Sequence, residues 1–150
     1  MSKTEIRFYH LQRTRLDAAL PQLLQRTLAK GWRAIVRAGT EERVEALNQS
    51  LWTADERSFI PHGSAKDGDA PEQPVWLTTK DENPNGAQVL MLVDGAECAD
   101  PGRYELVCTV FDGNDPEALD TARAQWKKLK DSGHTLTYWQ QTATGWEQKA

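Results

Sequence analysis

The stretch EIRFYHLQRTRLDAALPQLLQRTLAKGWRAIVRA, from Glu5 to Ala38, decides the fold class. Its first segment, residues 5–11, is short and rich in β-prone side chains, which predicts a strand. Five leucines between positions 16 and 28 then fall on one helical face, and Gly31 follows them as a stop signal. Residues 32–38 form a second β-prone run. The order strand, helix, strand predicts parallel strands joined by a helix that packs on the sheet.

The rest of the chain extends this pattern. Thr40 precedes two glutamates and predicts the N-terminus of a second helix. Three further strands are predicted in VWLTT, AQVLMLVDG and RYELVCTVFDG, and a final helix begins after Asp115. We expect a single α/β domain over 1–150, with a Rossmann-like three-layer fold, a largely parallel central sheet, helices on both faces and an antiparallel C-terminal edge. Residues 61–74 are predicted to form an exposed loop.

Composition narrows the function. The chain has 150 residues, 39% of them hydrophobic, and a net charge of −4, so it reads as a globular protein that lacks the basic character of unaided nucleic-acid binders. The two cysteines, Cys98 and Cys108, are too few and too far apart for a disulfide framework. Neither a signal peptide nor a membrane-spanning run is present in the sequence, which predicts a cytoplasmic protein.

Catalytic signatures are missing from the sequence. The glycine-rich nucleotide loops and the nucleophile elbow are absent, and the three histidines, His10, His62 and His134, lack metal-ligand spacing. We therefore expect no catalytic residue, no cofactor and no metal site. The alternative is a small enzyme that uses the carboxyl edge of the sheet, with His62 or Asp112 as acid or base.

An aromatic segment follows the second predicted helix. In LWTADERSFIPHG, Trp52, Phe59 and Pro61 stand among charged residues beside a polar loop. Exposed aromatic residues of this kind are frequent anchors of protein interfaces. A satellite core cluster beneath the loop is the other interpretation.

The last predicted helix carries a basic strip on an otherwise acidic protein. Arg123 and Lys127 are neighbours on one face, Lys130 follows one turn later, and Trp126 lies between them. An arginine can bind a carboxylate while an aromatic wall holds a ring, which suits an acidic peptide with an apolar end. The competing interpretations are a solvated helix face and a direct nucleic-acid binder.

Several motifs together resemble one known family. They are FYHL, GWRAIVRA, LWTADERSFIPHG, QPVWLT, VFDG, ARAQWKKLKDSGHTLTYWQQ and the closing GWE. Over essentially its whole length the chain is similar to the chi subunits of the bacterial DNA polymerase III clamp-loader complex. The most specific segments are the aromatic segment that begins at Leu51 and the helix segment ARAQWK.

The resemblance implies a non-enzymatic replisome adaptor that contacts DNA only indirectly and no membrane. Trp52, Phe59 and Pro61 would bind the psi subunit, and a related surface can receive a helicase. Arg123, with Trp126 and Lys127 beside it, would bind the acidic C-terminal tail of single-stranded DNA-binding protein. Leu119 stands where the family has a lysine, so the basic lip would come from Lys127, Lys128 or Lys130 instead.

Overall fold

An eight-stranded sheet and three α-helices make up the part of the chain that the computed structural model describes, namely residues 4–53, 62–64, 68, 70–98, 101–131 and 133–149. At positions 17, 52 and 53 the description is limited to the backbone. In chain order the elements are β1 (Glu5–Leu11), α1 (Leu16–Ala29), β2 (Ala34–Arg37), α2 (Glu41–Thr53), β3 (Gly63–Ser64), β4 (Val75–Thr78), β5 (Val89–Leu92), β6 (Leu106–Asp112), α3 (Pro116–Lys130), β7 (Thr135–Gln141) and β8 (Trp146–Gln148), with short 3-10 turns at Ala70–Glu72 and Pro101–Arg103.

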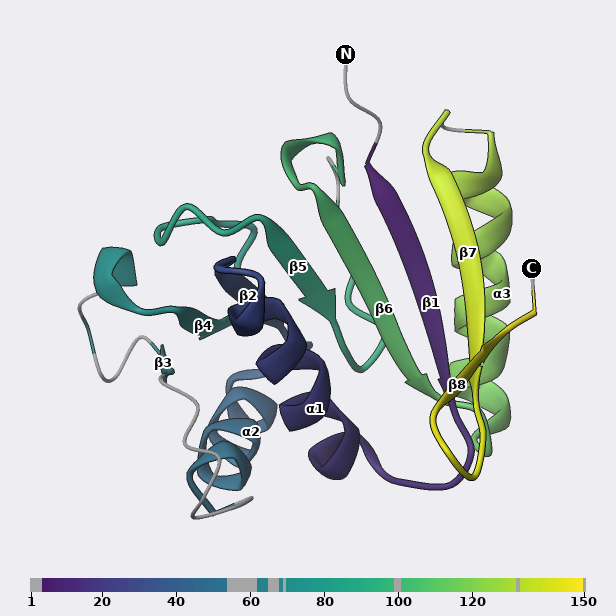
Figure 1. Cartoon of the computed structure of the whole chain (residues 1–150), viewed down its shortest axis with the longest axis horizontal. Helices are drawn as coiled ribbons and strands as arrows, with labels where there is room; N and C mark the ends of the chain where they lie inside the picture. The colour runs from purple at the N-terminus through teal and green to yellow at the C-terminus, as the bar shows by residue number, and fades with distance from the viewer. Residues whose placement is uncertain are drawn as a thin grey trace.

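The strands lie in the order β3-β4-β2-β5-β6-β1-β7-β8 (Figure 1). Every neighbouring pair from β3 to β7 is parallel, and β7 and β8 form the antiparallel edge. β1 lies between β6 and β7, so Phe8 has Thr109 on one side and Tyr138 on the other. The predicted α/β class, with its parallel sheet and antiparallel C-terminal edge, is confirmed.

Alternate side chains of the strands supply two separate hydrophobic clusters, one on each face of the sheet. Tyr9 and Leu11 of β1 pack into a cluster with the apolar faces of α1 and α2. Phe8, which points the opposite way, packs into a second cluster with Ala122 of α3. The sheet is therefore covered on both faces, as three layers require. Truncating a fully buried member such as Leu24 would cost about 2–5 kcal/mol.

The chain leaves two adjacent strands toward opposite faces. β1 continues into α1, and β6 continues into α3, which crosses β1 before β7 begins (Figure 1). Leu11 and Asp112, at the ends of these two strands, are partners in the sheet register. In open parallel sheets such a switch point creates a crevice at the carboxyl ends of the strands.

Local signals place the helix starts. Asp115 caps α3 by accepting from the backbone N–H of Glu117 at 3.1 Å, and Thr40 accepts from the N–H of Arg43 at 3.1 Å, both as predicted. The entry to α1 is held differently. The side-chain oxygen of Gln141, at the end of β7, accepts from the backbone N–H groups of Gln12, Arg13 and Thr14. A residue of the last third of the chain therefore shapes the first loop.

The segment predicted as an exposed loop contains buried structure. Gly63 and Ser64 form β3, which pairs with β4, and both are buried. His62 is also buried, and its Nε2 atom lies 3.2 Å from the carbonyl oxygen of Asn48 in α2. Two residues are enough to extend a parallel sheet, and Gly and Ser gave no strand signal in the sequence.

Within the described ranges, no helix is both long enough and apolar enough to cross a membrane.

Candidate functional site

The exposed side of α3 carries the predicted basic strip. Arg123, Lys127 and Lys130 are exposed, whereas Ala122 and Gln125 face the sheet and are buried. None of the ion pairs within the described ranges engages the three cations of the strip. Uncompensated charges with this spacing form a favourable surface for an anion.

Two adjacent lysines of α3 serve different sides of the helix. Lys128 extends toward Glu97, with 3.8 Å between Nζ of the lysine and Oε2 of the glutamate. Lys127 lies four residues after Arg123 and therefore on the same side of the helix. Lys128 also lines a small pocket with Leu129 on the far side of the strip. Lys128 is therefore not part of the strip.

Trp126 belongs partly to the core. Its ring packs edge-on against Phe8, with 5.3 Å between ring centroids, and against Tyr138 at 6.0 Å. It remains half-buried, so one part of the indole supports α3 on the sheet and the other part faces the surface. Both predicted roles, inward packing and an aromatic wall, are compatible with this position.

Tyr138 and His10 join this surface, and sequence reasoning missed both. Tyr138 lies on β7 and His10 on β1, and the Nδ1 atom of His10 is within hydrogen-bonding distance of the Tyr138 hydroxyl. Both rings also pack against Phe111 of β6, at centroid distances of 5.2 Å for His10 and 6.1 Å for Tyr138. The period-2 pattern of β7 could have placed Tyr138 on the same face as Leu136, but the pairing of β7 with β1 has no local signal.

The charge of Arg123 reaches both missed residues. Burial lowers the pKa of His10, Arg123 lowers it further, and the carboxylate of Asp112 opposes them. Burial raises the pKa of the Tyr138 hydroxyl, and Arg123 opposes that shift. Trp126, Tyr138 and His10 are joined by direct contacts, and together with Arg123, whose charge acts on the last two, they make up what we call the α3–β7 site.

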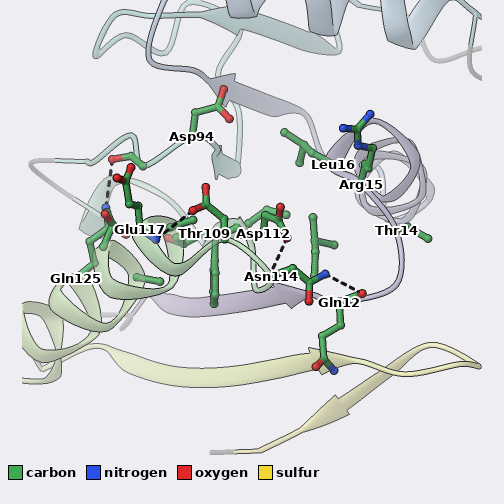
Figure 2. Close-up of a pocket in the computed structure, with 18 of the residues that line it drawn as sticks. Gln12, Thr14, Arg15, Leu16, Asp94, Thr109, Asp112, Asn114, Glu117 and Gln125 are labelled. Atoms are coloured by element: carbon green, nitrogen blue, oxygen red, sulfur yellow. Dashed lines mark hydrogen bonds between the residues drawn. The ribbon is translucent and has the colours of Figure 1, made fainter.

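A second candidate lies at the switch point of the sheet (Figure 2). It is an open cavity of about 840 Å³, bounded by the loop after β1 and by the first turns of α3. Arg13 and Arg15 line the α1 side, and Asp112, Asp115 and Glu117 line the α3 side. Cationic side chains on one side of the cavity therefore face carboxylates on the other, so neither sign of charge dominates the cavity as a whole.

The residues proposed for acid–base chemistry do not come together in this cavity. Asp112 lines it, but one of its carboxylate oxygens accepts from the backbone N–H of Asn114 at 2.9 Å and serves the turn into α3. His62 lies elsewhere, beneath α2. The two residues that the enzyme alternative named, His62 and Asp112, therefore lie in different parts of the fold.

Metal-binding groups and reactive thiols were sought among the residues that the structure describes. These residues include no group of three or more His, Cys, Asp or Glu side chains placed to hold a metal ion. Cys98 and Cys108 are not joined to each other, as predicted. Burial raises the pKa of the Cys108 thiol to about 12, which keeps it protonated and unreactive at neutral pH.

The aromatic segment predicted to bind a partner lies mostly outside the description. Phe59 and Pro61 are not among the described residues, and Trp52 is described by its backbone alone, in the last turn of α2. The assignment of Trp52, Phe59 and Pro61 to a partner surface stays a prediction.

The fold and the α3–β7 site define a Rossmann-like α/β protein with an exposed basic strip beside aromatic rings. A family model described as "DNA polymerase III chi subunit, HolC" matches residues 3–137. The chain belongs to this family of DNA polymerase III subunits, which confirms the resemblance seen in the sequence.

A curated relative gives the same family name. The chain is 30% identical over 91 residues to the "Probable DNA polymerase III subunit chi" of Rickettsia prowazekii (strain Madrid E). The match covers 61% of this chain and 55% of the relative, so it spans about half the length of that protein.

Proposed function

We propose that the chain is a non-enzymatic adaptor of the replisome. It links the clamp-loader complex, through the psi subunit, to the acidic C-terminal tail of single-stranded DNA-binding protein. It acts in the cytoplasm, where the bacterial chromosome is replicated, and meets DNA only through its partners. Membership of the DNA polymerase III chi family supports the complex to which we assign it.

The α3–β7 site is the proposed receptor for the tail, and the exposed Arg123 is the observation that carries this assignment. A guanidinium can bind a terminal carboxylate with two parallel hydrogen bonds. Lys127 and Lys130 extend the positive charge along α3 for the acidic residues that precede the terminus. The exposed part of Trp126 offers an apolar wall to the aromatic residue of the tail.

The second proposed surface is the segment that holds Trp52, Phe59 and Pro61, which would bind psi and can receive a helicase. Its support is the sequence resemblance, together with the position of Trp52 at the end of α2. α2, which ends at Thr53, packs on the face of the sheet opposite to α3.

The small size of the α3–β7 site sets the expected affinity. A short tail buries little area, so we expect a Kd of about 1 μM, or about 8 kcal/mol of binding free energy. Because the strip is exposed, added salt should weaken binding. Weak, exchangeable contacts suit an adaptor that must follow a moving replication complex.

The test is a titration with a fluorescent peptide that copies the C-terminus of single-stranded DNA-binding protein from the same organism. Arg123→Ala should abolish binding, whereas Lys128→Ala, which removes an equal charge on the other side of α3, should leave it nearly unchanged. The same peptide with an amidated C-terminus should bind much more weakly. Equal loss in both variants would mean that net charge, not a specific site, governs binding.

The second surface is tested with psi in the same way. Phe59→Ala should weaken psi binding and spare the tail, and Arg123→Ala should do the reverse. If both substitutions weakened both partners equally while the variants stayed folded, the model of two independent surfaces would be wrong.

A further inference from the structure

His10 occupies an unusual position within the α3–β7 site. Its ring is half-buried between Phe111 and Tyr138, on the face of the sheet that α3 covers. The turn after β6 makes room for it, because a Cβ atom on Gly113 would lie only 1.8 Å from Nε2 of His10. The backbone of Gly113 is itself fixed by a hydrogen bond from its N–H to the carbonyl of Leu11 at 2.7 Å. A glycine at this turn is therefore required for His10 to sit where it does.

The contact between His10 and Tyr138 has two possible directions, and they differ in what Tyr138 can do. When Nδ1 of His10 carries no proton, it accepts the hydroxyl hydrogen of Tyr138, which then has none left to donate elsewhere. Nδ1–H donates to the Tyr138 oxygen in the neutral tautomer that carries its proton on Nδ1 and in the imidazolium, and only the imidazolium excludes the reverse direction. The hydroxyl hydrogen of Tyr138 is then available to another acceptor.

The charged and titratable groups around His10 come from three elements. Arg123 of α3 disfavours the imidazolium, Asp112 of β6 favours it, and Tyr138 of β7 is the hydrogen-bond partner. Burial and the cation outweigh the carboxylate, so the pKa of His10 is lowered in the free protein. A ligand that neutralises Arg123 would remove one of the two causes of this shift and add a negative charge that stabilises the imidazolium.

We propose that His10 is a positioning residue of the α3–β7 site and that an anion bound at Arg123 recruits a proton from solvent onto His10, which turns the Tyr138 hydroxyl into a donor to that anion. The proposal rests on the proposed function, because the anion is the terminal carboxylate of an acidic peptide. It gives Tyr138 a ligand-binding role and His10 a positioning role in the site, and it makes peptide binding proton-linked.

The direction of the pH dependence follows from linkage. If the bound anion raises the pKa of His10, the complex takes up a proton wherever the pH lies between the free and bound pKa values. Affinity is then constant above the bound pKa, rises as the pH falls through this window, and is constant again below the free pKa. Each unit of pKa increase corresponds to about a tenfold gain in affinity between the two plateaus. The carboxylates of the peptide stay ionised above about pH 5, so their own titration does not contribute to the pH dependence above that value.

The proposal is tested on the whole chain with the tail peptide and its amidated form as probes. The pKa of His10 is read from its ring-proton NMR signals with and without saturating peptide, and the Kd is measured from pH 5.5 to 8. We expect the pKa of His10 to rise on binding and the Kd to fall as the pH falls. His10→Gln should remove the pH dependence, and Tyr138→Phe, which keeps the ring but not the hydroxyl, should weaken binding most at low pH. His134→Gln, at the start of β7 and far along the strand from His10, is the matched control and should keep the wild-type pH profile.

The outcomes separate this inference from the proposed function. Peptide binding that depends on Arg123 but not on pH, with an unchanged pKa of His10, would overturn the inference and leave the adaptor function intact. An absence of peptide binding at every pH would overturn both. Because the NMR measurement uses the wild-type chain, the first result does not depend on whether His10→Gln folds well.

Discussion

The Nδ1 atom of His10 and the hydroxyl of Tyr138 are hydrogen-bonding partners although they lie 128 positions apart in the chain. The parallel pairing of β1 with β7 brings them together, since Phe8 and Tyr138 share a register position and His10 follows on the same face. Trp126 of α3 packs on Tyr138, and the charge of Arg123 lowers the pKa of His10. The surface proposed to bind a partner is thus connected to the strand pair β1 and β7 of the sheet.

Gly113→Ala should destabilise the protein. The new Cβ would lie 1.8 Å from Nε2 of His10, so the ring or the turn must move, at a cost of about 1–3 kcal/mol. Gly39→Ala is the matched control, because its Cβ would meet only the carbonyl oxygen of Asp94 at 3.8 Å. Urea denaturation measures both. If His10→Ala in the Gly113→Ala background did not recover stability, the collision with His10 would not be the cause.

Stability should depend on pH through His10. Its pKa is lowered in the folded protein by burial and by Arg123, so the unfolded chain binds the proton more readily. Stability from this source is fully present above the unfolded pKa of about 6.5 and is lost as the pH falls toward the folded pKa. The difference between wild type and His10→Gln, followed by urea denaturation from pH 5 to 8, isolates this contribution. A wild-type stability that rose relative to His10→Gln as the pH fell would contradict the assigned direction.

Trp126→Ala should reduce both stability and peptide binding. The indole packs on Phe8 and Tyr138 but is only half-buried, so we expect a stability loss of about 2–3 kcal/mol. Trp146→Ala provides the comparison, because Trp146 packs on Tyr9 on the other face of the sheet at a centroid distance of 4.8 Å. It should lower stability by a similar amount and leave the peptide Kd unchanged. Equal effects on binding would show that binding reports general stability.

Asp81→Asn should lower the free energy of unfolding by more than the removal of a surface charge normally does. Asp81 accepts from Arg37 at 2.7 Å and from Arg103 at 2.6 Å, and the side chain of Arg37 is only 6% exposed. Removing the carboxylate leaves a buried guanidinium without its anion, which we expect to cost about 1–3 kcal/mol because Asp81 itself is partly solvated. Glu147→Gln, in an exposed pair with Lys149, should change the free energy of unfolding by less than about 0.5 kcal/mol. Both values come from urea denaturation, and equal values would mean that the burial of Arg37 adds nothing.

Much of the fold was predictable because its signals are local. The leucine period of α1, the cap and proline at the start of α3, and the β-prone runs each act within a few residues. The basic strip was predictable for the same reason, since i,i+4 spacing on a helix needs no tertiary information. The burial of His62 was not predictable from local signals. His62 directly precedes β3, and β3 exists only through its pairing with β4.

The sequence by itself determined the α/β class, the order of strands and helices, the family and the candidate cations on α3. Only the tertiary structure decided which residues accompany those cations. His10 and Tyr138 meet each other, and the charge of Arg123 acts on both, because β1 lies between β6 and β7 and because α3 packs on that face. Strand adjacency depends on how whole elements pack to bury their apolar faces, a balance summed over the domain that no short stretch encodes. The site therefore combines a helix that the sequence specifies with a sheet neighbourhood that only folding creates.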